Sequence, residues 1–318
     1  MRILFTSAGR RVELAQCFRA AASQLGANCE IHACDLNPDL SPACRKADFS
    51  FAVPRCTEPG YVDVLHEYCE ARSIDLLVPT IDPELPFLAA ARDRFAQSGT
   101  IVHVSSPEAI DIVRDKQKTI EALAAVGVPV PRTASADEAR RFSNEWSFPA
   151  FIKPSGGSAS RGIGALRGPE DIRDDYDEPM IVQEFLQGPE YTVNIYVDGH
   201  GKLLSAVPHI RLSVRAGEVE KGRTERNPAF WEIAKGVVAS LPKPRGAMCF
   251  QLIVDPDKGP RVFEINARFG GGYPLADHAG ARFAESLLAG LLGRPECASN
   301  EWREDVTMLR YDAAVFDG

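Results

Sequence analysis

Several features of membrane, secreted and zinc-binding proteins are missing from this sequence. No run approaches the roughly 20 uninterrupted apolar residues that a membrane span requires. The first residues, Met1–Phe5, have a strand pattern and lack the charged-then-apolar signal of a secreted protein. None of the eight cysteines forms a CxxC pair, so we expect free thiols in a reducing compartment and no zinc site. These absences predict a cytoplasmic protein that does not enter a membrane.

An excess of basic residues is also missing. The 318 residues include 36 Lys and Arg against 44 Asp and Glu, which gives a net charge of -8. Because nucleic-acid binding requires a basic face for the phosphates, we do not expect a nucleic acid as the partner. The shares of hydrophobic residues (45%) and charged residues (25%) are typical of a globular protein, and the length favours two or three domains.

The first 112 residues alternate between strand and helix patterns. Short apolar strands are expected at 2–5, 30–34, 75–79 and 100–104, and helices at 12–25, 61–72 and 84–95. Short strands separated by helices of this length predict an α/β fold with a parallel, doubly wound sheet.

The dinucleotide fingerprint of such a sheet is absent. Only Gly9 is present where three glycines are needed, and Arg10 and Arg11 would crowd a pyrophosphate. We therefore expect a Rossmann-like domain without NAD, not a dehydrogenase. The two arginines face either a carboxylate or phosphate of a substrate, or solvent, and both interpretations stay open here.

A glycine-rich loop follows a buried strand in the next part of the chain. The strand, residues 148–154, ends at Lys153, and the loop Ser155–Gly164 holds four glycines and three serines. Backbone N–H groups of such a loop can surround phosphate oxygens without obstruction from side chains. No Gly-Lys-Ser/Thr follows, so it is not a Walker loop. The loop and the lysine together predict a phosphate site.

A second run of strands begins at residue 180. Strands are expected at 180–186 and in a hairpin formed by 190–198 and 202–208. The stretch 211–226 is basic and is expected to be a loop that is either solvated or close to a substrate; its basic residues are Arg211, Arg215, Lys221, Arg223 and Arg226.

Polar side chains share one face of a further hairpin, formed by 246–255 and 261–268. Glu264, Asn266 and Arg268 alternate with apolar residues on its second strand, and Gln251 lies on the partner strand. One carboxylate and two amide oxygens are suitable ligands for Mg²⁺. Arg268 would stabilise charge on a transferring phosphoryl group, and a close-approach loop, 270–272, follows it.

In their order along the chain, these blocks resemble the ATP-grasp superfamily. The resemblance is to its ligases related to carbamoyl phosphate synthetase and biotin carboxylase. It is carried by four stretches: DKQKTIEALAAVGVPVPRT, FPAFIKPSGGSASRGIG, MIVQEFLQGPEYTVNIYVD and FQLIVDPDKGPRVFEINARFGGG. It implies a Rossmann-like domain (1–112), a central ATP-grasp lobe with a glycine-rich lid (113–187) and a C-terminal lobe with a metal site (188–318).

The resemblance also implies roles for individual residues. Those implied to hold ATP are Lys116 and Lys153 on the phosphates, Gly156, Gly157, Ser158 and Gly162 in the lid, Glu184, Phe185 and Leu186 in the adenine hinge, and Glu190 at the ribose. Those implied to hold one or two Mg²⁺ ions, or Mn²⁺, are Gln251, Glu264 and Asn266. Arg268, with Lys153, would act on the γ-phosphate and on the acyl phosphate formed from it.

The chemistry implied is attack of a carboxylate on the γ-phosphate, followed by capture of the acyl phosphate by an amine or another nucleophile. Many relatives place an acid where this chain has Gln251, and an amide weakens that metal position. The acceptor is expected between the N-terminal domain, the basic loop and the 270–272 loop, with Arg211 or Arg215 anchoring its carboxylate. A short chain has no room for a biotin-carrying domain, which favours a small carboxylate–amine ligase, and a homodimer is left open.

Two other functions stay open at this point. One is a regulatory ATP-binding protein that has lost catalysis, and the intact Lys153, Glu264, Asn266 and Arg268 argue against it. The other is a phosphotransferase whose phosphorylated product is stable.

Overall fold

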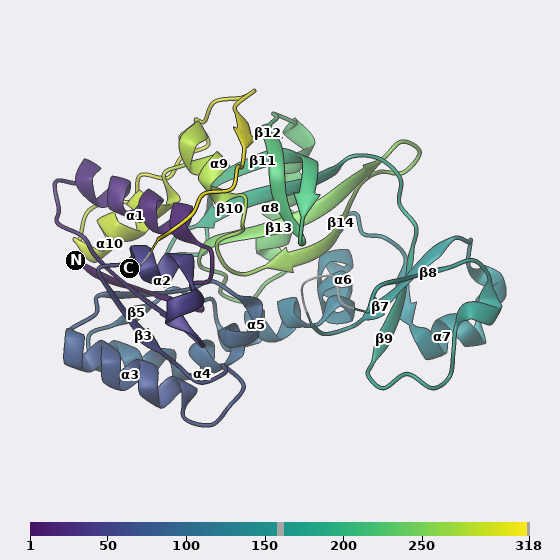
Figure 1. The fold of residues 1–318 in the computed structure, drawn as a ribbon. Helices are drawn as coiled ribbons and strands as arrows, with labels where there is room; N and C mark the ends of the chain where they lie inside the picture. The colour runs from purple at the N-terminus through teal and green to yellow at the C-terminus, as the bar shows by residue number, and fades with distance from the viewer. Residues whose placement is uncertain (158–161, 317–318) are drawn as a thin grey trace.

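The computed structural model describes residues 1–157 and 162–316, which form three β-sheets (Figure 1). The first is a parallel sheet with the strand order β3-β2-β1-β4-β5. Its strands are β1 (Arg2–Thr6), β2 (Glu30–Asp35), β3 (Phe49–Ala52), β4 (Leu76–Pro79) and β5 (Ile101–Val102). The connecting helices are α1 (Val12–Gln24), α2 (Pro42–Lys46), α3 (Tyr61–Arg72) and α4 (Leu85–Gln97), with 3-10 turns η1 (Pro38–Leu40) and η2 (Asp82–Glu84). The α/β alternation predicted from the sequence is confirmed.

Two parts of this sheet differ from the sequence prediction. The strand expected at 100–104 is reduced to Ile101–Val102, because the chain then leaves the sheet and continues into α5 (Pro107–Arg114) and α6 (Lys116–Ala125). The segment after β2 contains α2 and the edge strand β3, which no pattern indicated. β3 is exposed along most of its length, so it lacks the apolar run that marks a buried strand.

The order of the parallel strands determines where a ligand can bind. β1 lies between β2 and β4, so the connections from β1 and β4 leave the sheet toward opposite sides. In open α/β sheets, ligands bind outside the carboxyl ends of the strands at such a switch point. The loops there are Ser7–Arg11 after β1 and Thr80–Asp82 after β4.

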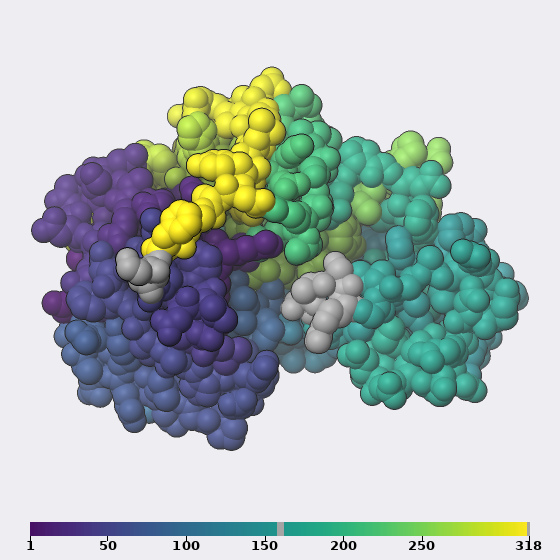
Figure 2. Space-filling view, viewed as in Figure 1, coloured from purple at the N-terminus to yellow at the C-terminus, as the bar shows by residue number. Residues whose placement is uncertain are grey.

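A small antiparallel sheet, in the order β6-β9-β7-β8, forms a lobe with its own core. Its elements are β6 (Thr133–Ser135), α7 (Ala136–Arg141), η3 (Ser143–Glu145), β7 (Ala150–Pro154), β8 (Gly164–Leu166), η4 (Pro169–Asp171) and β9 (Met180–Glu184). Trp146, Ile152 and Val182 lie at the centre of this core. In Figure 2 this lobe, coloured teal, stands away from the purple and blue parallel-sheet region.

A large antiparallel sheet completes the molecule, in the order β14-β13-β10-β11-β12-β15. Its strands are β10 (Glu190–Val197), β11 (Leu203–Arg215), β12 (Glu218–Thr224), β13 (Gly246–Asp255), β14 (Gly259–Asn266) and β15 (Thr307–Leu309). The helices are α8 (Pro228–Ala239), α9 (Tyr273–Ala279) and α10 (Phe283–Leu291). Both predicted hairpins, 190–208 and 246–268, are present, with Gln251 paired directly to Glu264.

The basic stretch 211–226 is not a loop, which corrects the sequence prediction. It forms the end of β11 and all of β12, joined by a tight turn at Ala216–Gly217 in which both residues have positive φ. Charged side chains on an exposed hairpin hide the alternation by which a strand is recognised. The hairpin places Glu218 at the inner end of β12.

The parallel sheet and the large sheet share hydrophobic cores. One core joins Leu77 and Val104 to Phe250 and Ile265, and a second joins Phe18 on α1 to Phe269 and Phe283. The buried His103 accepts a hydrogen bond from Ala247 N at 3.0 Å across the same junction. The predicted division at 112/113 and 187/188 stays a prediction. The first of these cores contains residues of all three predicted parts, including Leu77, Leu123 and Phe250. No helix of the described chain is long and apolar enough to cross a bilayer.

Candidate active site

A cavity of about 740 Å³ lies where the three sheets face one another. Its walls come from the loop after β4, from β7 and β9 of the small lobe, and from β10, β13, β14 and the β11–β12 turn of the large sheet. Residues far apart in the chain thus meet around one space, and most of the residues predicted from the sequence line it.

Two lysines lie in the part of the cavity next to the small lobe. Lys153 Nζ, at the end of β7, donates to Gln183 Oε1 at 2.8 Å. Lys116 Nζ, at the start of α6, donates to the carbonyl oxygens of Pro154 and Gly156, both at 3.0 Å. Burial lowers the pKa of Lys153 to about 8, with Glu264 opposing and Lys116 adding to the shift. Neither lysine forms an ion pair with a carboxylate in the described part of the chain, so both charges are available to phosphates.

An apolar slot adjoins the two lysines. The rings of Phe151 and Phe185 stack with their centroids 5.0 Å apart, and Leu186, Ile253 and Phe263 line the cavity beside them. Of the predicted hinge, Glu184 and Leu186 line the cavity, whereas Phe185 does not and instead stacks on Phe151. A flat aromatic base such as adenine fits between apolar walls of this kind.

The predicted lid is only partly at the cavity. Gly156 and Gly157 line it. Gly162 instead packs against the strand, since a Cβ there would lie 3.0 Å from Pro154 Cγ. Ser158, also assigned to the lid, lies outside the described residues.

Glu190 and Arg211 form an ion pair in the wall of the cavity. Arg211 is almost completely buried, and its second nitrogen donates to Gly217 O at 2.9 Å. Burial raises the pKa of Glu190, and Arg211 opposes that shift. The sequence assigned these two residues separately, to the ribose and to the acceptor. The structure joins them, so Arg211 is held by a carboxylate of the chain itself.

The predicted metal ligands lie together on β13 and β14. Glu264, Asn266 and Gln251 all line the cavity. The amide of Gln251 fits best with its nitrogen donating to Glu264 Oε2 at 3.1 Å and its oxygen accepting from Arg211 Nη1 at 2.7 Å. In that orientation the Gln251 oxygen is already engaged by Arg211, so Glu264 and Asn266 are the better ligands.

These ligands fit Mg²⁺ bound together with phosphates. Among the described residues no cluster of three His, Cys, Asp or Glu side chains could hold a metal ion. One carboxylate and an amide oxygen are too few for an octahedral ion by themselves, but Mg²⁺ commonly takes its remaining ligands from nucleotide phosphates and water. Lys116 and Lys153, which could bind such phosphates, line the same cavity.

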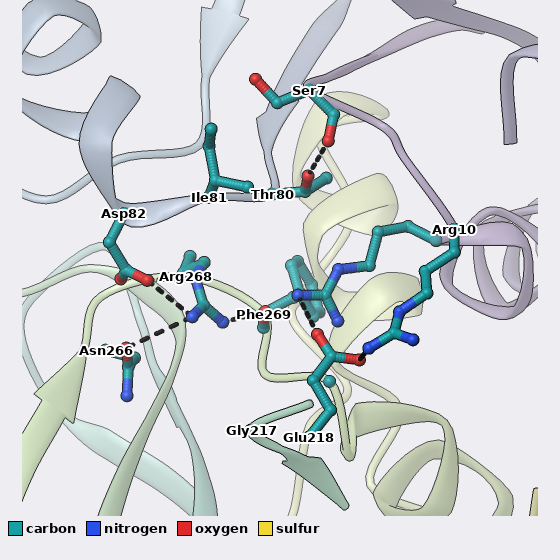
Figure 3. A network of polar contacts seen from close by, with 12 residues as sticks. Ser7, Arg10, Thr80, Ile81, Asp82, Gly217, Glu218, Asn266, Arg268 and Phe269 are labelled. Carbon is teal, nitrogen blue, oxygen red and sulfur yellow. Dashed lines mark hydrogen bonds and ion pairs between the residues drawn. The ribbon is translucent and has the colours of Figure 1, made fainter. Parts of the chain in front are cut away.

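Arg268 also lines the cavity, where it takes part in a network of polar contacts (Figure 3). Its Nε and Nη2 both donate to Asp82 Oδ2, at 3.0 and 2.6 Å, and Nη2 also approaches Asn266 Oδ1 at 3.3 Å. Burial alone would lower the pKa of Arg268, but the Asp82 carboxylate raises it above its ordinary value. A buried guanidinium is thereby kept charged beside a predicted metal ligand.

A cluster of charged residues lies next to Arg268, and the sequence analysis did not predict it. Arg11 and Arg10, from the loop after β1, and Arg310, after β15, surround the carboxylate of Glu218. Arg11 lines the cavity with 15% of its side chain exposed, whereas 54% of Arg10 is exposed. Of the two interpretations of these arginines, the structure supports a buried role for Arg11 and a solvated one for Arg10.

Two predicted elements of the acceptor site do not line the cavity. Arg215 is 48% exposed at the far end of β11 and pairs with Glu220 at 3.0 Å and Asp312 at 2.8 Å. The 270–272 loop approaches the protein interior, because a Cβ at Gly270 would lie 2.8 Å from Cys249 Sγ and one at Gly272 would lie 2.5 Å from His209. The placement of Arg215 at the acceptor stays a prediction that this structure does not support, since the residue pairs with Glu220 and Asp312 outside the cavity.

Several cavity residues were missed by sequence reasoning. The strand-end rule could have found Thr80–Asp82, which follow β4 directly. Gln183 directly precedes the predicted hinge on β9, but strand alternation places it on the other face from Glu184, so no pattern indicated it. No signal in the sequence links Glu218 or Arg310 to Arg11, because these residues are distant in the chain and lie in segments of different structure.

Two family profiles match the chain. A profile described as an ATP-grasp domain matches residues 113–272, and one described as the N-terminal domain of PylC-like proteins matches residues 3–103.

Known proteins match more distantly. Phosphoribosylamine–glycine ligase of Escherichia coli O6:H1 is 24% identical over 288 residues, which cover 78% of this chain and 66% of that protein. The chain therefore spans about two thirds of the length of that relative. Biotin carboxylase of Campylobacter jejuni has a TM-score of 0.77 at 16% identity, covering 96% of this chain and 74% of its own. An L-amino acid ligase of Bacillus licheniformis has a TM-score of 0.67 at 19% identity, covering 93% and 75%. The two structural matches show a shared fold.

Proposed function

This chain belongs to the ATP-grasp domain family, and from that premise we propose that it is an ADP-forming carboxylate–amine ligase. The observation that supports the proposal most directly is a single cavity that is lined by Lys116, Lys153, Glu264, Asn266 and Arg268. Several of the similar proteins are described as ligases, including the phosphoribosylamine–glycine and L-amino acid ligases. Small-molecule carboxylates and amines are the proposed substrates.

Residues in different places of the cavity have different proposed roles. The base of ATP occupies the apolar slot beside Phe151, and Lys116 and Lys153 hold its phosphates. Glu264 and Asn266, with Gln251 beside them, hold Mg²⁺ or Mn²⁺. When bound, the ion neutralises phosphate charge.

The reaction has two steps. A carboxylate oxygen of the substrate attacks the γ-phosphorus, the bond to the β-phosphate oxygen breaks, and ADP leaves. An amine then attacks the acyl carbon, inorganic phosphate leaves, and the amine loses a proton. Arg268 lies where it can stabilise the charge on the transferring phosphoryl group and on the acyl phosphate.

Two observations favour this function over the alternatives left open by the sequence. The lysines, Glu264 and Arg268 lie together in the cavity, which a protein without catalysis has no need to maintain. A stable phosphorylated product would need no space for a second nucleophile, yet the cavity extends past Arg268 to Arg11 and Glu218. The cytoplasmic location and the homodimer stay predictions.

Release of ADP from MgATP in the presence of paired carboxylates and amines tests the proposal. Hydroxylamine should replace the amine and yield a hydroxamate, because it captures an acyl phosphate. Glu264→Gln should abolish turnover, whereas the matched control Glu232→Gln, at an exposed residue of α8, should not. Binding of an ATP analogue without ADP release from any carboxylate would support the regulatory alternative. ADP release without a hydroxamate would support the phosphotransferase.

A further inference from the structure

Three arginines from two distant segments converge on one carboxylate beside Arg268. Arg11 Nη2 lies 2.7 Å from Glu218 Oε1, while Arg310 Nη1 and Arg10 Nη2 lie 3.2 and 3.6 Å from Oε2. Figure 3 shows Glu218 pointing from the end of its hairpin into the group. Burial alone would raise the pKa of Glu218, but the guanidinium groups lower it overall. The arrangement is an anion-binding site in which the bound carboxylate is the side chain of Glu218 from the same protein.

The positive charge of this site is not balanced. Three guanidinium groups face one carboxylate, which leaves a surplus of two positive charges. The neighbouring pairs are balanced, since Arg268 is paired with Asp82 and Arg211 with Glu190. The surplus therefore belongs to the Arg10, Arg11 and Arg310 group, which we call the arginine cluster.

Solvent does not compensate all of this charge. Arg11 and Arg310 are mostly buried, and burial lowers the pKa of Arg11, opposed by Glu218 and reinforced by Arg268 and Arg310. A partly buried group with surplus charge is costly unless an ion of opposite sign joins it. Carboxylates and phosphates are the anions that forked guanidinium groups bind well.

The arginine cluster is separate from the place where the reaction would occur. The reacting carboxylate must reach the γ-phosphate near Lys153, Glu264 and Arg268. Arg11 and Glu218 line the same cavity, and Figure 3 shows the Arg268–Asp82 pair and the carboxylate of Glu218 as separate groups. A ligand that spans both places needs one group that reacts and another that binds the arginine cluster.

We propose that a substrate of this enzyme carries a second acidic group, a carboxylate or a phosphate, which the arginine cluster binds through Arg11. This inference rests on the proposed function. Glu218 is the resident counter-ion, which the acidic group of the substrate joins or displaces from Arg11.

Binding of simple anions tests the site independently of catalysis. Succinate, inorganic phosphate and acetate are added at constant ionic strength to protein already loaded with Mg²⁺ and a non-hydrolysable ATP analogue, which occupies the lysines. Succinate or phosphate should raise the melting temperature more than acetate, because a ligand of the folded state stabilises it by mass action. Comparing the two dianions identifies the favoured acidic group.

Three variants sharpen the binding test. Arg11→Gln should weaken dianion binding at least about tenfold, as expected for loss of a charge-assisted pair. Glu218→Gln, which removes the competing charge, should bind the dianion more tightly. Arg94→Gln, at an exposed arginine paired with Asp63, should behave as wild type. Retained ATP-analogue binding shows that each variant is folded. Failure of both dianions to stabilise the wild type, or full binding by Arg11→Gln, overturns the proposal.

Paired substrates separate failure of this inference from failure of the proposed function. ADP release is compared for glutamate and glutamine, aspartate and asparagine, and phosphoserine and serine, as carboxylate or as amine. The acidic member should be preferred at least about tenfold in kcat/KM, and Arg11→Gln should lose that preference. Equal use of both members would contradict the acidic-group assignment. Dianion binding without ADP release from any compound would contradict the ligase and leave the anion site standing.

Discussion

The lysines and the arginines of the cavity hold their positive charges in different ways. We call the region of Lys116 and Lys153 the nucleotide part, and the region of Arg268 and Arg11 the acceptor part. In the nucleotide part, Lys153 and Lys116 donate to a side-chain amide and to backbone carbonyls, all neutral acceptors. In the acceptor part, Arg268 and Arg11 are each paired with a carboxylate of the chain. A lysine whose partners are neutral oxygens can pair with any phosphate. An arginine that is already paired with a carboxylate must be shared between that carboxylate and the ligand. The first part is suited to a common nucleotide and the second to discrimination among substrates.

The largest effect should come from the nucleotide part. Lys153→Met keeps the apolar stem and removes the charge, so the phosphates lose their most buried cation. We expect ADP formation to fall about 100-fold or more, as when an electrostatic group is removed from the site of a reaction. Measured turnover and ATP-analogue binding should both fall. The control Lys235→Met, at an exposed lysine of α8, should retain both. Near-normal turnover in Lys153→Met would remove the lysine from the proposed site.

A large effect of another kind is expected in the acceptor part. Asp82→Asn removes the charge that balances Arg268, whose pair with Asp82 has only 14% and 8% of the two side chains exposed. A buried guanidinium without its counter-ion should cost about 2 kcal/mol of unfolding free energy, below the full cost of deleting a buried partner because the amide oxygen can still accept. Denaturant unfolding measures that loss.

The same variant separates the two parts of the cavity. ATP-analogue binding by Asp82→Asn should persist while ADP formation falls, since Asp82 holds Arg268, which we propose to act on the transferring phosphoryl group. If analogue binding fell as far as turnover, the two parts would not be independent.

A moderate effect follows from pH. Burial lowers the pKa of Lys153 to about 8, so its charge is lost as the pH rises through that value. Phosphates favour the charged form. Affinity for the MgATP analogue should therefore fall about tenfold between pH 7 and pH 9, since one unit above the pKa leaves about a tenth of the group charged. Calorimetry across this range measures it.

A variant identifies the group responsible for the pH dependence. Lys153→Arg keeps its charge over the whole range, so its affinity profile should be flat whatever its absolute value. An equally steep decline in this variant would assign the pH dependence to another group.

The sequence predicted the nucleotide part of the cavity better than the acceptor part. The family resemblance is confirmed, and the residues proposed for the ATP site could be assigned because strand pattern, glycine loop and hairpin are local in sequence. Lys153 and Glu264 each lie on a strand whose alternation shows which way they point. The residues of the acceptor part could not be predicted from local sequence patterns. Arg11, Asp82, Glu218 and Arg310 come from loops and strand ends of different segments, and only tertiary packing brings them together. The position of Arg215 outside the cavity could not be foreseen for the same reason, because the direction of an exposed hairpin is set by packing.

The smallest effect should come from Arg215 itself. Its guanidinium pairs with Glu220 and Asp312 on an exposed edge, outside the cavity. Exposed ion pairs contribute little, because water and salt screen them and the long side chains lose entropy on pairing. Arg215→Ala should leave kcat and KM within about twofold of wild type under the conditions in which Arg11→Gln changes dianion binding at least about tenfold. The two variants differ in whether the arginine reaches the cavity, although both sequence positions looked equally basic. A KM for the acidic substrate that rose as much in Arg215→Ala as in Arg11→Gln would mean that the hairpin turns inward when the substrate binds, and that the acceptor part is completed by the ligand.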